Sequence, residues 1–439
     1  EELRQLKVRP SGRALFDMAI NQGARVVLIS DMYLPAEFIQ RVMQEAGYPA
    51  ELPLYLSSTI GVRKHEGELF DYVKKTENIN VKHWLHVGDN PHGDISIPAA
   101  KGIQGFQIKS AYQGVAQNQK YGSTIRQSKQ NQLLGESAVF GLIQKRFFSQ
   151  ASGFVASNTH FDGNPFMLGY AGLGMLLFGY LSWLMNQAKN SGIETIVFLS
   201  RDAKVLFQMA EILYPTSEGW PKLRYGLASR RSIRLGNLRS KSDIIKLANS
   251  SLSSISLRDF FSRKFNVILD VEDCQALAEV GVFNVDVKVN ALTNAILIDA
   301  ALKLSSRILE ESQKQREMLK SYYADLGIIS DKQCAVVDIG YSGSLQAGIS
   351  EITGCPQLQG YYYITFNTAK EWEFYTGKMH GYAGEFVNPK NHADLICKNG
   401  FLYETLFNAA EYSFWCFNRL ENGEKEPVFD VVDNDAFGD

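Results

Sequence analysis

Short, mainly apolar runs recur along the chain, and polar or small residues follow them. The clearest runs are residues 24–29, 84–87, 194–199, 334–337 and 360–366. Runs without alternation are typical of parallel strands that are buried on both faces. Segments with helical spacing of apolar residues lie between many of them. The pattern therefore predicts an α/β fold with two doubly wound parallel-sheet (Rossmann-like) domains.

The same pattern predicts where the domains begin and end. We expect a first domain at residues 1–112, a polar connector and a helix at 113–150, and a second domain at 151–439. Residues from about 240 to 330 show mainly helical spacing. This stretch predicts a largely helical insertion in the second domain.

One stretch is apolar enough to raise the question of a membrane span. Residues Phe166 to Met185 contain no charged residue over 20 positions, which meets the length of a transmembrane helix. The stretch also has four glycines and two tyrosines and lacks flanking basic clusters. We therefore expect a fully buried helix of a soluble protein.

Composition narrows the classes of function. The 439 residues carry a formal net charge of −2, so no broad basic field predicts a nucleic-acid partner. The five cysteines are scattered along the chain, which is typical of reduced thiols in the cytoplasm. We expect a cytoplasmic protein, which could also associate with the inner face of a membrane.

Polar residues in the first domain predict a phosphoryl-transfer site. Ser30 follows the run at 24–29, Lys64 opens a helical segment, and Asp89 and Asp94 follow the run at 84–87. Strand ends and helix starts converge on one crevice in such sheets. A hydroxyl and an ammonium group can hold phosphate oxygens, while Asp89 and Asp94 are the expected ligands of Mg²⁺.

These positions resemble three motifs of the haloacid dehalogenase superfamily. Its second, third and fourth motifs correspond here to Ser30, Lys64 and the segment Gly88–Asp94. The resemblance implies a magnesium-dependent phosphatase with catalytic roles for Ser30, Lys64 and Asp89. The nucleophile motif of that family, Asp-x-Asp-x-Thr, does not occur in the sequence. Either its strand precedes Glu1, which we expect, or the unit is catalytically inactive.

Cationic loops in the second domain predict phosphate binding. One loop follows the run at 194–199, and the other follows an expected strand that ends near Gly226. Cations at helix starts bind anions, and arginine suits bidentate phosphate contacts. A solvated basic turn is the alternative for the second loop. The predicted residues on the two loops are Ser200, Arg201, Asp202, Lys204, Arg230 and Arg231.

A third loop follows the run at 334–337 and begins with Asp338. Its glycines let the backbone approach a ligand closely, and its serines offer hydroxyl and amide groups at a helix start. We expect a catalytic role for Asp338. The remaining predicted ligand-binding residues are Gly340, Tyr341, Ser342, Gly343 and Ser344.

This third loop resembles the ribose-phosphate loop of the type I phosphoribosyltransferases. Asp338 corresponds to the second acidic residue of that motif, and Ser342 and Gly343 to its hydroxyl residue and glycine. The resemblance implies phosphoribosyl pyrophosphate as a ligand, with Asp338 at the ribose hydroxyls. The sequence departs from the motif at Val337, Tyr341 and Leu345.

The order of all these segments resembles bacterial surface-polysaccharide proteins that join the two kinds of domain. The resemblance implies a ribofuranosyltransferase for O-antigen or capsule, with Mg²⁺ as cofactor. One domain would transfer 5-phosphoribosyl to a glycan acceptor, expected to be lipid-linked, and the other would remove the phosphate. It also implies peripheral association with polysaccharide-assembly machinery. The alternatives are a sugar-phosphate or nucleotide phosphatase with a C-terminal specificity domain, and a non-catalytic scaffold.

Overall fold

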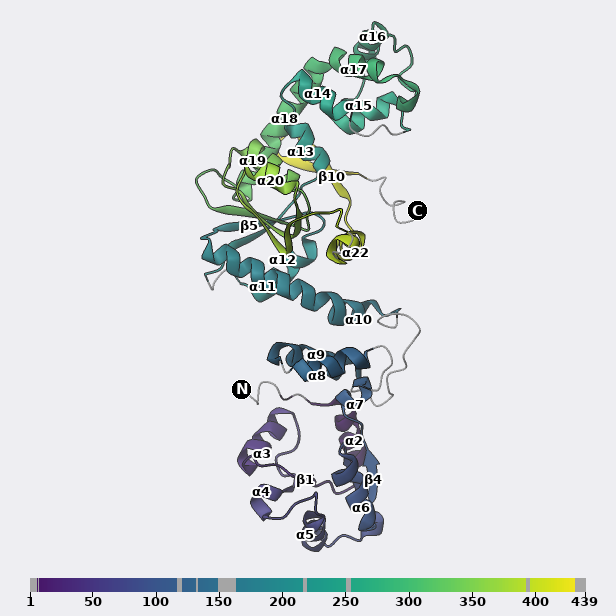
Figure 1. Ribbon diagram of the computed structural model, residues 1–439, viewed down its shortest axis with the longest axis vertical. Helices are drawn as coiled ribbons and strands as arrows, with labels where there is room; N and C mark the ends of the chain where they lie inside the picture. The colour runs from purple at the N-terminus through teal and green to yellow at the C-terminus, as the bar shows by residue number, and fades with distance from the viewer. Residues whose placement is uncertain are drawn as a thin grey trace. The chain divides into compact units, whose positions relative to one another are not determined.

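The computed structural model describes residues 6, 8–116, 121–131, 133–148, 163–215, 219–249, 254–391 and 395–430. The predicted start of the second domain, residue 151, lies outside these residues, as do parts of the predicted connector. Contacts divide the chain into two compact units, Glu1–Met175 and Leu176–Asp439. Both units mix helices with parallel strands (Figure 1). The predicted α/β fold class is therefore confirmed.

Two short parallel pairs of strands form the sheets of the first unit. Strand β1 (Leu28–Ser30) pairs with β2 (Leu54–Leu56), and β3 (Leu85–Gly88) pairs with β4 (Gln104–Gln107). The helices around them are α2 (Pro10–Asn21), α3 (Ala36–Glu45), α4 (Ser57–Ile60), α5 (Glu68–Glu77), η1 (Val81–His83), η2 (Pro91–Ser96) and α6 (Ile97–Ala100).

The core of the first unit is small. Phe70 and Val73 on α5 pack with Trp84 and Ile103 beside the strands. Two sequence-based expectations need correction here. The first strand is shorter than residues 24–29, because its partner β2 pairs with only three residues. Lys64 does not open the helix but lies in a turn four residues before it.

Helices dominate the rest of the first unit. They are α7 (Ala111–Ala116), α8 (Gly122–Asn131), α9 (Leu134–Phe148), α10 (Pro165–Met167) and η4 (Leu168–Leu173). The last two continue into α11 (Gly174–Asn190). Within the described residues, Pro165–Asn190 is the one helical stretch long and apolar enough to cross a membrane. Its second half is buried through Leu181 and Leu184, but Phe166 is 53% exposed. The expectation of a fully buried helix is wrong for the first half.

A five-stranded parallel sheet organises the second unit, in the order β6-β5-β7-β8-β9. The strands are β5 (Thr195–Leu199), β6 (Lys222–Gly226), β7 (Cys334–Asp338), β8 (Gln359–Phe366) and β9 (Met379–Val387). Strands β5 and β7 are buried at every position, as their unbroken apolar sequences predict. The chain leaves β5 toward β6 on one side and later returns to β7 on the other. The sheet therefore has a topological switch point between β5 and β7.

Helices connect these strands. They are α12 (Lys204–Leu213), α13 (Arg230–Gly236), α19 (Ser344–Thr353) and α20 (Ala369–Glu373). Helix α11 packs on the sheet through the Tyr180 hydroxyl, which lies 2.8 Å from the Tyr361 carbonyl oxygen and 3.1 Å from that of Asp338. This contact joins α11 to the carboxyl end of β7.

The helical insertion has its own core. Its helices are α14 (Lys241–Ala248), α15 (Leu257–Phe265), α16 (Val271–Ala278), η6 (Val289–Ala291), α17 (Asn294–Lys303) and α18 (Ser305–Asp325). Figure 1 shows α14–α17 grouped away from the five-stranded sheet, with α18 leading back to it. Phe260, Phe261 and Phe265 on α15 are buried in this core together with Leu257 and Ile244.

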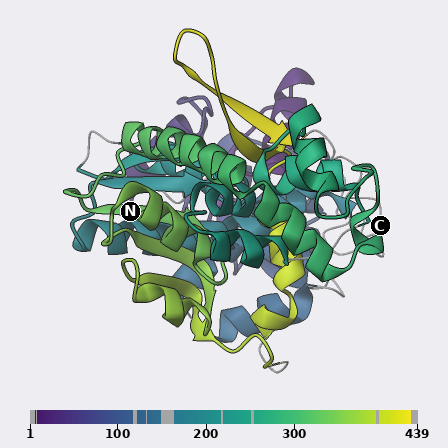
Figure 2. The ribbon, with the colours of Figure 1, turned by 90° about the horizontal axis from the view of Figure 1, so that it is seen from above.

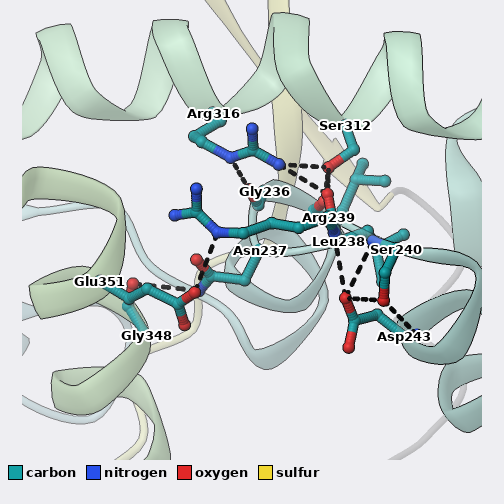
Figure 3. Close-up of polar contacts among 11 residues, drawn as sticks. Gly236, Asn237, Leu238, Arg239, Ser240, Asp243, Ser312, Arg316, Gly348 and Glu351 are labelled. Atoms are coloured by element: carbon teal, nitrogen blue, oxygen red, sulfur yellow. Dashed lines mark hydrogen bonds and ion pairs between the residues drawn. The ribbon is translucent and has the colours of Figure 1, made fainter. Parts of the chain in front are cut away.

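A polar network fixes the insertion to the sheet domain (Figure 3). The Arg316 guanidinium on α18 donates to the carbonyl oxygens of Gly236 (2.7 Å) and Leu238 (2.6 Å) at the end of α13. Asn237 donates to the Gly348 carbonyl oxygen on α19 at 3.0 Å. Because α13 and α19 both begin at the switch-point edge, this network links the insertion to the loops there.

The remaining elements cover the sheet domain. Helices α21 (Leu395–Lys398) and α22 (Gly400–Phe407) precede an antiparallel hairpin of β10 (Ser413–Arg419) and β11 (Lys425–Asp430). Figure 2 shows the turn of this hairpin, in yellow, standing out from the ribbon. Phe414 and Phe417 of β10 pack into the same core as Val197 and Val336 of the sheet.

Candidate functional site

The switch point of the five-stranded sheet brings three predicted loops together. Residues 200–203 follow β5, residues 227–229 follow β6, and residues 339–343 follow β7. Strands β6, β5 and β7 are neighbours and parallel, so their carboxyl ends lie at one edge. This edge is where open α/β sheets bind ligands.

The first loop is tied to the second. The Ser200 hydroxyl accepts from the Ala228 amide at 3.0 Å and lies 3.2 Å from the Ala228 carbonyl oxygen. Ser229 then caps α13 in a capping box with Ser232, so Arg230 occupies the first turn of a well-defined helix. Ser200 therefore acts on the loop backbone and supports the position of Arg230.

Asp338 lies deep at the end of β7. Its carboxylate accepts from the Ile339 amide at 2.8 Å, and the residue is 7% exposed. Burial is the main cause that raises the pKa of this carboxyl to about 7, and repulsion from Asp202 adds to it. Arg230 acts in the opposite direction on both Asp338 and Asp202. The structure thus brings Asp202, Arg230 and Asp338 within electrostatic reach of one another.

Arg201 and Lys204 both already contact Glu411. Lys204 forms an ion pair with Glu411 at 2.8 Å, and the Arg201 guanidinium donates to the Glu411 carbonyl oxygen at 3.2 Å. Tyr225 on β6 donates to the same carboxylate at 2.5 Å. Burial opposes ionisation of Glu411, but the hydrogen bonds from Lys204 and Tyr225 outweigh it and lower the pKa of its carboxyl.

The contacts of Tyr341 hold the third loop in place. The Tyr341 ring stacks on Phe366 of β8 with 4.5 Å between centroids, and its hydroxyl donates to the Gly400 carbonyl oxygen at the start of α22. Burial and the Glu404 carboxylate raise the pKa of the Tyr341 phenol. Glu404 also acts on Asp202. Helix α22 therefore contributes Glu404 to the same group of charges.

Close packing explains the glycine before α19. Gly343 has φ +73°, and a Cβ atom there would lie 2.2 Å from the Met379 sulfur. Only glycine satisfies both conditions. Ser342 accepts a hydrogen bond from the Thr368 hydroxyl at 3.1 Å, and Ser344 begins α19. Gly340, with φ +157°, packs against the Ile364 carbonyl oxygen.

Arg231 does not join this group. Its guanidinium forms an ion pair with Asp430 at 3.0 Å, lies 4.0 Å from the centre of the Trp415 ring and donates to the Arg263 carbonyl oxygen. These contacts connect α13 to α15 and to the hairpin. The structure thus separates Arg231 from its neighbour Arg230, because consecutive helical residues face different directions.

A second polar group forms in the first unit around Asp94. This buried carboxylate lies 2.6 Å from the Lys64 ammonium and 2.9 Å from His86 Nε2, and it accepts from the Asn90 amide at 2.9 Å. Burial favours the protonated form, but the hydrogen bonds from His86 and Lys64 outweigh it and hold the pKa of Asp94 well below its usual range. A Cβ atom on Gly88 would lie 2.2 Å from the Asp94 carboxyl carbon, so glycine is required there.

Ser30, another predicted residue, is the last residue of β1. Asp31, which follows Ser30 at the end of β1, accepts from the backbone amides of Lys64 (2.6 Å) and His65 (2.9 Å). The turn bearing Lys64 is therefore fixed at the end of β1. Asp89 is exposed at the end of β3. The sequence pattern does not single out His86, although its place inside β3 with Asp94 eight residues later is a usable signal.

Asp89 and Asp94 are the predicted magnesium ligands, and the carboxylates at the switch point form a second acidic group. Within the described residues, no group of three or more histidine, cysteine or acidic side chains could hold a metal ion by itself. Asp94 has both carboxylate oxygens occupied by protein donors. Asp202 and Asp338 have raised pKa values, mainly through burial and in part through mutual repulsion for Asp338. A cation held near them would relieve that repulsion, and substrate oxygens would have to supply its other ligands.

No protein-family model matches the chain, and no curated protein matches it either.

Proposed function

We propose that the second unit transfers a 5-phosphoribosyl group from phosphoribosyl pyrophosphate to a glycan acceptor. The supporting observation is the meeting of Asp338, Asp202 and Arg230 at the topological switch point. A carboxylate pair beside a cation suits a ligand that carries both hydroxyls and phosphates. Arg201 in the loop after β5 and Lys204 at the start of α12 add cations for the pyrophosphate.

The reaction would exchange one bond at the ribose anomeric carbon. The acceptor hydroxyl oxygen bonds to C1, the bond from C1 to the pyrophosphate oxygen breaks, and pyrophosphate leaves with the electron pair. Arg230, Arg201 and Lys204 would stabilise the leaving charge. Asp338 would hold the ribose hydroxyls, and a site carboxylate such as Glu404 can take the acceptor proton. Mg²⁺ would neutralise charge between the pyrophosphate and the carboxylates.

The first unit would then remove the 5-phosphate from the product. Lys64 would bind the phosphate oxygens, and Ser30 and Asp89 would assist. The aspartate nucleophile expected from the family resemblance would have to come from outside these motifs. Joining both activities in one chain raises the concentration of the intermediate at the second site.

The experiment offers the protein Mg²⁺, phosphoribosyl pyrophosphate and a panel of synthetic lipid-linked glycan acceptors. Pyrophosphate release and the product mass are followed together. The proposal expects pyrophosphate release with an acceptor heavier by one phosphoribosyl group, which Asp338→Asn abolishes. Phosphate release from sugar phosphates or nucleotides without transfer would favour a phosphatase. No reaction of either kind would favour a scaffold.

A further inference from the structure

A pocket of about 500 Å³ opens at the amino edge of the five-stranded sheet. Ser191 lines it before β5, Gln333 immediately before β7, and Gln357 and Gln359 at the start of β8. Its other wall includes His380, the second residue of β9. The switch-point loops lie at the opposite, carboxyl edge. The pocket is therefore separate from the candidate transferase site.

Neutral groups that can both donate and accept hydrogen bonds dominate the lining. The lining contains the side-chain amides of Gln333, Gln357 and Gln359. It also contains the hydroxyls of Ser191 and Thr376. Gln333 donates to Gln357 at 3.2 Å, which orients part of this wall. Such groups match the alternating donors and acceptors of sugar hydroxyls.

The charged groups of the pocket do not form an anion site. One ammonium, from Lys378, and one carboxylate, from Glu373, line the pocket together, so their charges offset each other. Glu373 is also held by the Met379 amide at 2.7 Å. Burial lowers the pKa of His380 and so favours its neutral imidazole, although Glu385, 3.8 Å away, acts in the opposite direction. A neutral ligand therefore fits better than a phosphate.

A buried hydroxyl lies beside the pocket without a good partner. Tyr361 is fully buried, and its hydroxyl makes no hydrogen bond of normal geometry to any residue in the described part of the chain. Its ring stacks on His380 with 5.4 Å between centroids. Burial raises the pKa of Tyr361, and Ser191 only partly offsets this. Ser191 and His380, which contact this tyrosine, line the pocket, whereas the hydroxyl oxygen itself is closed to solvent. Tyr361 therefore shapes the wall of the pocket from behind.

Three exposed aromatic residues come from the segment that forms the pocket wall. Trp372, Phe374 and Tyr375 are 40%, 88% and 68% exposed, and the same segment supplies Glu373 and Thr376 to the pocket lining. Consecutive large apolar side chains in solvent are uncommon and indicate a binding surface. Flat rings of this kind can cover the apolar face of a sugar.

We propose that this pocket binds a neutral sugar residue of a glycan, with the amides at its hydroxyls and the aromatic segment beside its ring. The proposal stands without the transferase activity, because it concerns the opposite edge of the sheet. If both hold, the pocket would keep a glycan chain attached while the other edge acts on its end.

The test measures binding of neutral sugars to the whole chain by saturation-transfer NMR. The probes are galactose, glucose, N-acetylglucosamine, rhamnose and lactose at up to 50 mM, with inorganic phosphate as the charged comparison. At least one sugar should bind with a Kd in the millimolar range. Two variants should each weaken the binding of that sugar at least fivefold. They are the double variant Gln333→Ala/Gln357→Ala and the variant Trp372→Ala.

Two matched variants make the result specific. Phe283→Ala removes an aromatic side chain that is 86% exposed in the helical insertion, and Gln208→Ala removes an exposed amide on α12. Both should bind the sugar as the wild type does, and thermal unfolding checks that every variant is folded. The proposal is overturned if no sugar binds, if phosphate alone binds, or if the pocket variants bind like the controls.

Discussion

Asp338 shows how one residue links the fold to the proposed chemistry. It ends a strand buried at every position, and that burial raises the pKa of its carboxyl to about 7. The unfolded chain would lose the same proton near pH 4. Between these values the folded protein holds more protons than the unfolded one.

Stability should therefore fall as pH rises from about 4 to 7 through this group. The sign follows because ionising a buried carboxyl disfavours the folded state, whereas the unfolded state ionises freely. Asp338→Asn should remove this dependence and raise the free energy of unfolding at pH 8 by about 1–3 kcal/mol. Urea unfolding at pH 5 and pH 8 measures it, with the exposed Asp331→Asn as control. Equal slopes for wild type and Asp338→Asn would contradict the account.

Because Glu411 forms an ion pair with Lys204, it should compete with an anionic ligand for this cation. Replacing Glu411 with glutamine should free the Lys204 ammonium from its ion pair, while Arg201 keeps its contact with the backbone carbonyl of residue 411. The affinity for pyrophosphate should rise about three- to tenfold. Titration calorimetry at two salt concentrations measures the change. Glu421→Gln, in the exposed hairpin turn, should leave the affinity unchanged. Weaker pyrophosphate binding by Glu411→Gln would show that Glu411 supports the site instead.

Where a charged side chain lies at or just after the end of a strand, the sequence predicted which residues the fold brings together. Asp338 ends β7, while Asp202 and Arg230 come shortly after β5 and β6, and the structure brings the three within electrostatic reach. The partners of the cations were not predictable in this way. Glu411 lies 210 residues from Arg201, on a loop whose position depends on how α22 and the hairpin pack. Arg231 was misleading because its direction depends on α15 and β11.

At the scale of helices and strands, the most specific contacts lie where the helical insertion joins the sheet domain. Sequence patterning finds the insertion, since its helices alternate apolar and polar faces. It does not reveal that Arg316 on α18 satisfies carbonyl groups at the end of α13. Such a contact joins segments about 80 residues apart and depends on their final orientation.

Arg316→Ala should destabilise the protein by about 1–3 kcal/mol, because the Gly236 carbonyl loses its side-chain donor and the Leu238 carbonyl keeps only Ser312. Arg239→Ala is the matched control on the same junction. Arg239 pairs with Glu351, and both side chains are about half exposed, so its loss should cost about 0–1 kcal/mol. Chemical denaturation of both variants measures the difference (Figure 3). Equal losses would contradict a special role for Arg316.

At the scale of the whole molecule, the strand order explains which predicted loops meet. The strand order β6-β5-β7-β8-β9 puts the switch point between β5 and β7. The loops after these two strands are among those predicted to bind a ligand. The sequence could predict parallel strands but not their order, because order depends on long-range pairing. In the first unit the same reasoning anticipated Lys64 and Asp94, while the contribution of His86 appears only in the folded chain.

Binding of phosphoribosyl pyrophosphate tests the switch-point site most directly. Titration calorimetry with Mg²⁺ would compare the wild type with Arg230→Ala and with Arg234→Ala, which is exposed one turn later on the same helix. The account predicts that the wild type binds, that Arg230→Ala weakens binding about tenfold or more, and that Arg234→Ala does not. No binding by the wild type, or equal binding by all three proteins, would contradict it.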